Sequence, residues 1–295
     1  MKLKGYFFAA LSAISYGLIP LFAIPFKNED ISFDTVLFYR FFFASVMIGV
    51  FLFAKGRSLK VSLKELSTLI ILGIMFALSS TCLFMGYDYL SAGVASTILF
   101  MYPVFVALIM GIFFKEKITW ITGTSIILAL TGVFILSVKD GSLEINIPGL
   151  IIVLLSALFY ALYIVMVNKS NVKKMPGAKL TVYSMFFCSM FFMVKSLIQG
   201  NSLNLPSTSS AGFIVIFAFI TTVISCISLV YAVHYIGSTP TAILGALEPV
   251  AAVSISVALF SEPLSINLVS GIIFIIAAVI LNILSDSLIR KKADA

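Results

Sequence analysis

Long apolar runs dominate the pattern of hydrophobic and polar positions along this chain. Ten stretches of about 20 residues carry almost no charge and are bounded by charged residues or by Gly and Pro clusters. A helix of that length crosses the ~30 Å hydrocarbon core of a bilayer. The runs are apolar on all sides and do not alternate, which is unlike the strands of a membrane barrel. We predict membrane-spanning helices near residues 5–26, 34–54, 66–87, 93–113, 119–138, 149–168, 178–199, 211–233, 240–260 and 267–287.

The composition supports the same interpretation. Hydrophobic residues make up 61% and charged residues 11% of the 295-residue chain, whereas soluble domains carry about 25% charged residues. Ten spans with short loops use the whole length and leave no room for a separate soluble domain. The first run has the length of a span, lacks a small-residue cleavage site and contains Pro20 and Pro25. We therefore expect it to be retained as a span rather than cleaved as a signal peptide.

Lys and Arg gather on one side of the predicted membrane. The loops on the other side hold only Lys27, Lys139 and Lys195. By the positive-inside rule both termini are predicted to be cytoplasmic, which requires an even number of spans. The net charge of +7 is therefore a topology signal, and without a soluble basic domain it gives no support for nucleic-acid binding. The richer side holds Lys2, Lys4, Lys55, Arg57, Lys60, Lys64, Lys115, Lys117, Lys169, Lys173, Lys174, Lys179, Arg290, Lys291 and Lys292.

The two halves of the chain repeat each other. At an offset of 144 residues, the stretch 11–18 (LSAISYGL) matches 155–162 (LSALFYAL), and later in each half the offset becomes 146. Leu and Ile matches are common by chance in apolar sequence, whereas paired Gly, Pro, Tyr and Glu residues are not. Pairs of these rarer kinds are Gly5 with Gly149, Tyr39 with Tyr183, Tyr89 with Tyr235, Pro103 with Pro249, and Glu116 with Glu262.

The repeat predicts two five-helix units, residues 1–145 and 146–295. Because each unit has an odd number of spans, the second enters the membrane from the opposite side, so the units are inverted relative to each other. Inverted repeats are a transporter architecture, with a substrate site near the midplane and alternating access by rocking one half against the other. A purely structural duplication is the alternative. The predicted fold class is thus an all-α membrane protein of ten transmembrane helices in two inverted five-helix repeats.

The chain resembles the EamA-type members of the drug/metabolite transporter superfamily over essentially its whole length. The resemblance implies a ten-helix fold with a central cavity lined mainly by helices 1, 3, 4, 6, 8 and 9. It also implies transport, often export, of amino acids or other small metabolites. These motifs are diffuse and mark the family rather than the substrate. The residues that carry the resemblance are Arg40 early in the second span, Pro103 in the fourth, Glu248 and Pro249 in the ninth, and Glu116 and Glu262 closing the fourth and ninth.

Two ionisable residues, Arg40 and Glu248, fall inside predicted spans, roughly 9 Å and 12 Å from the nearer ends at 1.5 Å per residue. A lone charge at the bilayer centre costs at least about 2.5 kcal/mol, so both are candidate binding residues. Arg40 would clamp a carboxylate or phosphate; alternatively it is structural, bonded to helix-end carbonyls or paired with Asp34 or Asp88. Glu248 would bind an amine or couple transport to protons, since burial favours the neutral carboxyl. The alternative is a neutral carboxyl that ties the ninth helix to its neighbours.

Pro103 and Pro249 lie in mid-span at matching positions of the two halves. Proline has no backbone donor, so each should free a carbonyl one turn earlier, near Leu99 and Gly245. Broken helices at matching positions point to the binding site of such transporters. These prolines are therefore candidates for gating, together with Glu248. A helix bend accommodated by packing is the alternative.

Four tyrosines inside predicted spans are candidates for lining a cavity: Tyr16, Tyr102, Tyr160 and Tyr163. Tyr16 and Tyr160 are equivalent in the repeat. Tyr residues are enriched at membrane interfaces, but Tyr16, Tyr102 and Tyr160 fall near mid-span, where an interfacial belt is the poorer explanation. We expect these rings to stack on a substrate.

Other functional classes receive little support. The single histidine, His234, has no neighbouring Ser or Cys in a nucleophile motif, and no Gly-rich phosphate loop is present, which argues against a hydrolase and an ATP-driven pump. The cysteines have unrelated spacings that suggest neither disulfides nor a zinc site. We therefore expect no catalytic residues, no metal and no cofactor. The cysteines are Cys82, Cys188 and Cys226.

A cavity with one cation, one carboxyl and several tyrosines suits a zwitterion. We therefore predict a transporter of amino acids or related metabolites, and the resemblance implies export. Its partners would be the small-molecule substrate and the lipid bilayer, with protons as candidate coupling ion. An exporter of neutral or lipophilic compounds is the first alternative, and a membrane scaffold or sensor the second. The short loops favour a bacterial inner (plasma) membrane, and the pattern carries no signal for an oligomeric state.

Overall fold

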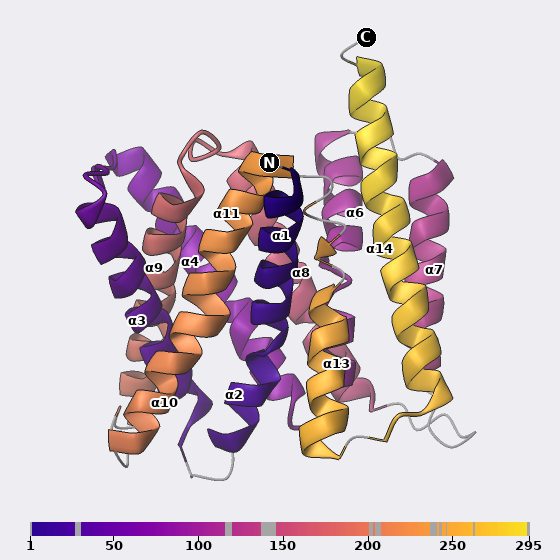
Figure 1. Ribbon diagram of the computed structural model, residues 1–295, viewed down its shortest axis with the longest axis horizontal. Coiled ribbons are helices and arrows are strands. Elements are labelled where there is room, and N and C mark those ends of the chain that lie inside the picture. The colour runs from indigo at the N-terminus through magenta and orange to yellow at the C-terminus, as the bar shows by residue number, and fades with distance from the viewer. Residues whose placement is uncertain are drawn as a thin grey trace.

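The described part of the chain is helical throughout (Figure 1). The computed structural model describes residues 2–26, 31–115, 120–136, 146–200, 203, 208–236, 241, 244–245, 247–261 and 263–293, and no β-strand occurs among them. The all-α prediction is confirmed for these residues. The helices of the first half are α1 (Lys2–Gly17), α2 (Ile19–Phe26), α3 (Phe33–Ala54), α4 (Leu63–Gly86), α5 (Ala92–Leu99), α6 (Tyr102–Phe114) and α7 (Trp120–Leu136).

The second half follows the same order. One short segment, η1, is a π-helix, a form that is rare and often found at functional sites. The elements are α8 (Ile147–Lys169), α9 (Gly177–Ile198), α10 (Thr208–Ala218), η1 (Phe219–Ile224), α11 (Ser225–Ile236), α13 (Leu247–Phe260) and α14 (Ile266–Ala293).

Seven helical segments of the described residues are long and apolar enough to cross a membrane, and three shorter apolar segments accompany them. Each of the ten overlaps one predicted span. The ten-span count itself stays a prediction, because the three shorter segments have only 10–17 residues. The long segments are Lys2–Phe26, Phe33–Ala54, Leu63–Gly86, Ala92–Phe114, Ile147–Lys169, Gly177–Ile198 and Ser209–Ile236, and the shorter ones are Gly123–Ile135, Leu247–Phe260 and Ile266–Leu281.

Polar side chains fix where several helices begin. At α4, Ser62 forms a capping box with Glu65: the Ser62 hydroxyl accepts from the Glu65 backbone, and the Glu65 carboxylate accepts from the Ser62 N–H at 2.7 Å. Ser32 caps α3 and Asn146 caps α8 in the simpler way. Such contacts satisfy the N–H groups that have no partner in the first helical turn.

Helices of the first half pack mainly on helices of the second. The most extensive contacts are α7 with α14, α3 with α9, α1 with α11 and α4 with α8, followed by α4 with α9, α5 with α13, α1 with α13 and α6 with α8. Figure 1 shows α7 and α14 side by side at one edge and α3 and α9 near the opposite edge. It also places the start of α1 and the end of α14 at the same end of the molecule, as an even number of spans requires.

Contacts between the halves occur in matched pairs. The Ser12 hydroxyl donates to the Ser225 carbonyl at 2.9 Å, joining α1 to α11, and the Ser156 hydroxyl donates to the Ser79 carbonyl at 2.7 Å, joining α8 to α4. The repeat relates Ser12 to Ser156 and Ser79 to Ser225. Thus the same interhelical hydrogen bond is made twice, with the roles of the halves exchanged.

Two glycines repeat this relationship at the helix ends. A Cβ on Gly5 would lie 2.8 Å from the Cβ of Tyr235, and a Cβ on Gly149 would lie 2.6 Å from the Cβ of Tyr89. Both glycines therefore allow a close approach that no other residue permits. Gly5 and Gly149 are equivalent in the repeat, as are Tyr89 and Tyr235.

Candidate functional site

Both prolines of the predicted site lie where a helix is interrupted. In the first half, α5 ends at Leu99 and α6 begins at Tyr102, so that Pro103 occupies the first turn of α6. In the second half, α13 begins at Leu247 and carries Glu248 and Pro249 in its first turn. Proline is well accommodated there because the first-turn N–H groups have no partner within the helix. The structure thus places both prolines at breaks between helical segments.

One detail of the proline prediction is wrong. The carbonyl of Gly245 is not left free, because it accepts a hydrogen bond from the Glu248 N–H at 2.9 Å. The N–H of Gly245 in turn donates to the Thr241 carbonyl at 3.1 Å. The chain therefore turns before α13. In a continuous helix the Gly245 carbonyl would have no donor, because Pro249 has no N–H, whereas here the Glu248 N–H donates to it.

The predicted tyrosines lie in one aromatic group on α1, α6 and α8. The rings of Tyr102 and Tyr160 meet edge to face with centroids 4.7 Å apart, and Tyr160 stacks on Tyr163 at 6.0 Å. Phe76 of α4 contacts Tyr160 and Tyr163 at 5.8 and 5.4 Å. Tyr16 lies near Tyr102 and Tyr160. All four tyrosines remain half-buried, so part of each side chain stays accessible.

Glu248 belongs to the same group. Its carboxyl lies near Tyr16, Tyr102 and Tyr160, and also near Tyr87 at the end of α4. The side chain is half-buried. Its position in the first turn of α13 places the carboxyl near the positive end of the helix dipole. Glu248 therefore presents an acidic group among phenol rings inside the predicted membrane.

Arg40 is buried on α3 and is held by the second half. Only 3% of its surface is exposed. Its Nε donates to the Thr222 hydroxyl at 3.3 Å, and its guanidinium carbon lies 4.4 Å from the Phe217 ring centroid and 5.1 Å from that of Phe41. A desolvated guanidinium over an aromatic face gains about 2 kcal/mol. Thr222 is part of η1, so the π-helical turn presents the hydroxyl that positions Arg40.

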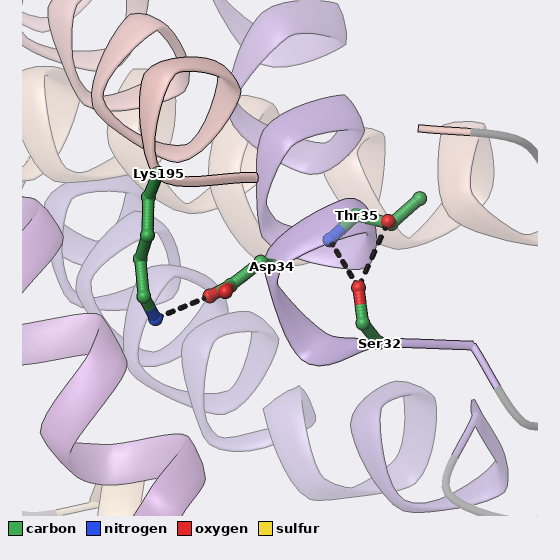
Figure 2. A network of polar contacts seen from close by, with 4 residues as sticks. All are labelled: Ser32, Asp34, Thr35 and Lys195. Carbon is green, nitrogen blue, oxygen red and sulfur yellow. Dashed lines mark hydrogen bonds and ion pairs between the residues drawn. The ribbon is translucent and has the colours of Figure 1, made fainter. Parts of the chain in front are cut away.

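Asp34 is not the counter-ion of Arg40. Its carboxylate pairs with Lys195 of α9 at 2.7 Å, next to the cap that Ser32 and Thr35 form at the start of α3 (Figure 2). This excludes one of the two structural partners considered for Arg40. The contacts described for the Arg40 side chain are to one hydroxyl and two aromatic rings.

Tyr16 links the two charged groups. It lies near both Glu248 and Arg40, as does Tyr87. Six of the predicted residues, Arg40, Tyr16, Tyr102, Tyr160, Tyr163 and Glu248, are thus connected through neighbouring side chains, whereas Pro103 and Pro249 lie next to Tyr102 and Glu248 along the chain. The arrangement therefore has a cation, a carboxyl and phenol groups in one region.

Two residues of this region were not predicted. A Cβ on Gly17 would lie 2.5 Å from the Glu248 carbonyl oxygen and 2.8 Å from the Ala251 Cβ, so only glycine lets α1 cross α13 this closely. A signal existed: Gly17 and its repeat counterpart Ala161 are both small. Thr222 had no comparable signal, because a hydroxyl in an apolar run usually bonds within its own helix.

The site shows no sign of a metal centre. Within the described residues, no three His, Cys, Asp or Glu side chains are grouped so as to hold a metal ion. Cys82, Cys188 and Cys226 are free thiols. Cys188 and Cys226 lie near Arg40.

Comparison with known proteins gives a consistent result. The model of the EamA-like transporter family matches residues 3–138 and again residues 147–284. An uncharacterized transporter of Archaeoglobus fulgidus is 27% identical over 277 residues, covering 91% of this chain and 95% of the relative. An uncharacterized transporter of Clostridium kluyveri is 24% identical over 301 residues, covering 99% and 95%.

The fold is also similar to a solved one. A protein of known crystal structure superposes with a TM-score of 0.66 at 16% sequence identity, covering 100% of this chain and 98% of the other. At that identity the likeness concerns the fold alone. The two family matches account for nearly all of the described helices, and the chain belongs to the EamA-like transporter family of integral membrane transporters.

Proposed function

We propose that this transporter moves a small zwitterionic metabolite, an amino acid or a related compound, and that it works as an exporter. The observation that carries the proposal is that Arg40 and Glu248 both lie near Tyr16, in apolar helical segments. A buried cation and a carboxyl without a direct ion pair between them match a ligand that has one charge of each sign. Intramembrane ionisable residues are functional candidates by default.

Arg40 is suited to the carboxylate of such a ligand. A guanidinium has five N–H donors in a planar fork, and the described side-chain hydrogen bond uses only Nε. The remaining fork can bind a carboxylate with two parallel hydrogen bonds. Glu248 would receive the ammonium group, and Tyr16 would bond to either end. The apolar part of the ligand would stack on Tyr102, Tyr160 and Tyr163.

The matched contacts between halves support an inverted repeat and transport by alternating access. Rocking of one half against the other needs interfaces that are equivalent in both directions, as the Ser12–Ser225 and Ser156–Ser79 contacts are. The helix breaks at Pro103 and Pro249 would serve as hinges. They divide the fourth and ninth spans, next to the tyrosines and the carboxyl of the site.

Orientation and coupling belong to the same proposal. We place the protein in a bacterial inner membrane with both termini in the cytoplasm, because the lysine-rich connections lie at the end of the molecule that holds the termini. Protons are the proposed coupling ion, with Glu248 as the group that binds them. Its carboxyl is half-buried among phenol rings, where a neutral form is accommodated at low cost.

A second candidate substrate is a flat, neutral or lipophilic compound. The edge-to-face and stacked rings of Tyr102, Tyr160, Tyr163 and Phe76 favour it, because aromatic faces bind apolar ligands without a charge. In that case Arg40 and Glu248 would be structural.

Flux through proteoliposomes separates the two candidates. A panel would contain amino acids, the matching amines without a carboxylate, the matching acids without an amine, and neutral aromatic compounds. Wild type should carry amino acids faster than either truncated form, Arg40→Ala should lose the preference for the carboxylate, and Glu248→Gln the preference for the amine. Lys4→Ala, which removes an exposed lysine, is the control. Flux of neutral compounds alone, unchanged in both variants, would overturn the zwitterion proposal in favour of the second candidate.

A further inference from the structure

Eight cations gather on two connections at one end of the molecule. We name this set the two-loop basic surface. Glu65 is the only carboxylate in residues 55–65 and 169–179. Seven of the eight cationic residues are exposed and Lys179 is half-buried. The surface consists of Lys55, Arg57, Lys60 and Lys64 between α3 and α4, and Lys169, Lys173, Lys174 and Lys179 between α8 and α9.

The two connections come from opposite halves and are in contact. The Lys179 ammonium donates to the Lys60 carbonyl, and the Tyr183 hydroxyl donates to the Leu59 carbonyl. Beneath them lies a buried apolar cluster that contains Leu69, Leu72, Val172 and Leu180. The two connections that carry the cations therefore meet at the junction between the halves.

The single carboxylate is already engaged. Glu65 accepts hydrogen bonds from the Ser62 N–H at 2.7 Å and from the Ser62 hydroxyl at 2.9 Å, as part of the capping box of α4. Glu65 also lies near Lys179, but its one negative charge offsets only part of the positive charge of the two stretches, and the excess attracts anions. The surface thus calls for an anionic partner.

Exposed apolar side chains adjoin the cations. Phe53 is 81% exposed and Leu63 is 85% exposed, and they flank the first connection. At the second connection, the Lys169 ammonium lies 5.1 Å from the ring centroid of Phe114, beside the exposed Phe113. A cation next to an apolar side chain at the end of a span fits a ligand with an anionic head and an acyl tail. That combination favours a lipid over a soluble anion.

The stretches that the repeat relates to the two connections do not carry a comparable set of cations. The stretches related by the repeat are residues 199–209 and 25–35. They contain one cation, Lys27, and three carboxylates, Glu29, Asp30 and Asp34. The basic surface is therefore a property of one end and does not follow from the duplicated scaffold.

We propose that the two-loop basic surface binds the phosphate headgroups of anionic phospholipids, and that the bound lipid bridges the two halves at this end. Clustered Lys and Arg residues beside a span attract anionic headgroups, at about 1 kcal/mol each. A lipid that contacts both connections holds the halves together and slows their separation at this end. This effect on transport rate rests on the proposed function, whereas the binding itself does not.

The binding test uses full-length protein in nanodiscs of phosphatidylcholine containing phosphatidylglycerol as the probe. After gentle detergent extraction, native mass spectrometry counts the phosphatidylglycerol molecules that remain bound. We expect wild type to enrich phosphatidylglycerol. The enrichment in the variant K60Q/K173Q/K174Q/K179Q should be lower by a factor of about ten or more. The control K2Q/K4Q/K291Q/K292Q removes the same charge near the chain termini and should keep it.

A charge-preserving variant distinguishes loss of charge from misfolding. K60R/K173R/K174R/K179R keeps all four charges and should retain the enrichment. Equal loss in the control and in the lysine-to-glutamine variant of the surface would overturn the proposal in favour of a general charge effect. Retained enrichment in the lysine-to-glutamine variant would overturn it as well. Neither result depends on the substrate, so failure here is distinct from failure of the zwitterion proposal.

Discussion

The two halves of this transporter share their scaffold but differ in their chemistry. At the scaffold level, Ser12 and Ser156 make the same hydrogen bond across the interface. At the site, by contrast, the second half has Glu248 where the first has Tyr102. The first half has Arg40 where the second has the buried Ser184, which lies beside Tyr163. Duplication thus explains how the helices fit together, and the departures from duplication mark where a ligand would be recognised.

The largest effect is expected from variants that erase this difference. Arg40→Ser and Glu248→Tyr each install the residue of the opposite half. Removing a buried charge that pairs with a ligand costs about 2–5 kcal/mol, so each variant should lower kcat/KM for the zwitterion at least about 30-fold. Uptake into proteoliposomes measures this ratio.

Ser184→Ala is the matched control, because it changes the position equivalent to Arg40 without removing a charge. It should stay within about threefold of wild type. If Arg40→Ser and Ser184→Ala had equal effects, the asymmetry between the halves would have no bearing on recognition.

The close crossing of α1 and α13 at Gly17 is a contact between the halves that can be tested directly. Gly17→Ala would place a methyl group 2.5 Å from the Glu248 carbonyl oxygen, so the helices must separate. Overpacking of this kind costs about 1–3 kcal/mol, and we expect a lower thermal midpoint in detergent together with slower transport. Gly212→Ala in α10 is the control, since a Cβ there meets no atom within 4 Å. An unchanged midpoint for Gly17→Ala would show that the crossing is looser than described.

The two ends of the α3–α9 pair form a second comparison. The Tyr39 hydroxyl donates to the Leu203 carbonyl at 3.0 Å, and its repeat counterpart Tyr183 donates to Leu59, so both ends have the same tether. Only one end adds an ion pair, Asp34–Lys195 (Figure 2). The equivalent residues at the other end are Ala178 and Phe51, which cannot form one.

We expect Lys195→Ala to favour opening at the end that holds Asp34. Partly exposed ion pairs contribute about 1 kcal/mol or less, so the open population should rise up to about fivefold. A cysteine at the buried Val36, in a background without the native cysteines, would react faster with an impermeant thiol reagent. Lys4→Ala should leave the rate unchanged, and the charge swap Asp34→Lys with Lys195→Asp should restore it. A swap that fails to restore the rate would show that the ion pair does not hold this end closed.

How much of the structure the sequence predicts depends on whether a feature is visible along the chain or arises from contacts between distant segments. Apolar runs and the repeat offset are one-dimensional, and they predicted the spans and the equivalence of Ser12 with Ser156. Which helix each serine bonds to depends on how spans pack in space, and no pattern along the chain encodes that. For the same reason the sequence suggested Asp34 as an ion-pair partner of Arg40, whereas Asp34 pairs with Lys195, which is distant in sequence. The π-helical turn that presents Thr222 has no sequence signature that could have been read in advance.

The smallest effect tests whether the scaffold is symmetric. Ser12→Ala and Ser156→Ala each remove a hydroxyl that bonds to both the carbonyl and the hydroxyl of a serine in the other half. An interhelical hydrogen bond in a membrane protein averages about 0.6 kcal/mol. Because the two contacts are equivalent, the two losses should agree within about 0.5 kcal/mol and should add in the double variant. Ser254→Ala, whose hydroxyl bonds only within its own helix to Val250, should cost less than either in equilibrium unfolding. A large cost for one serine and none for the other would mean that one interface carries the stability, and equivalent interfaces could then no longer explain how the halves exchange roles during transport.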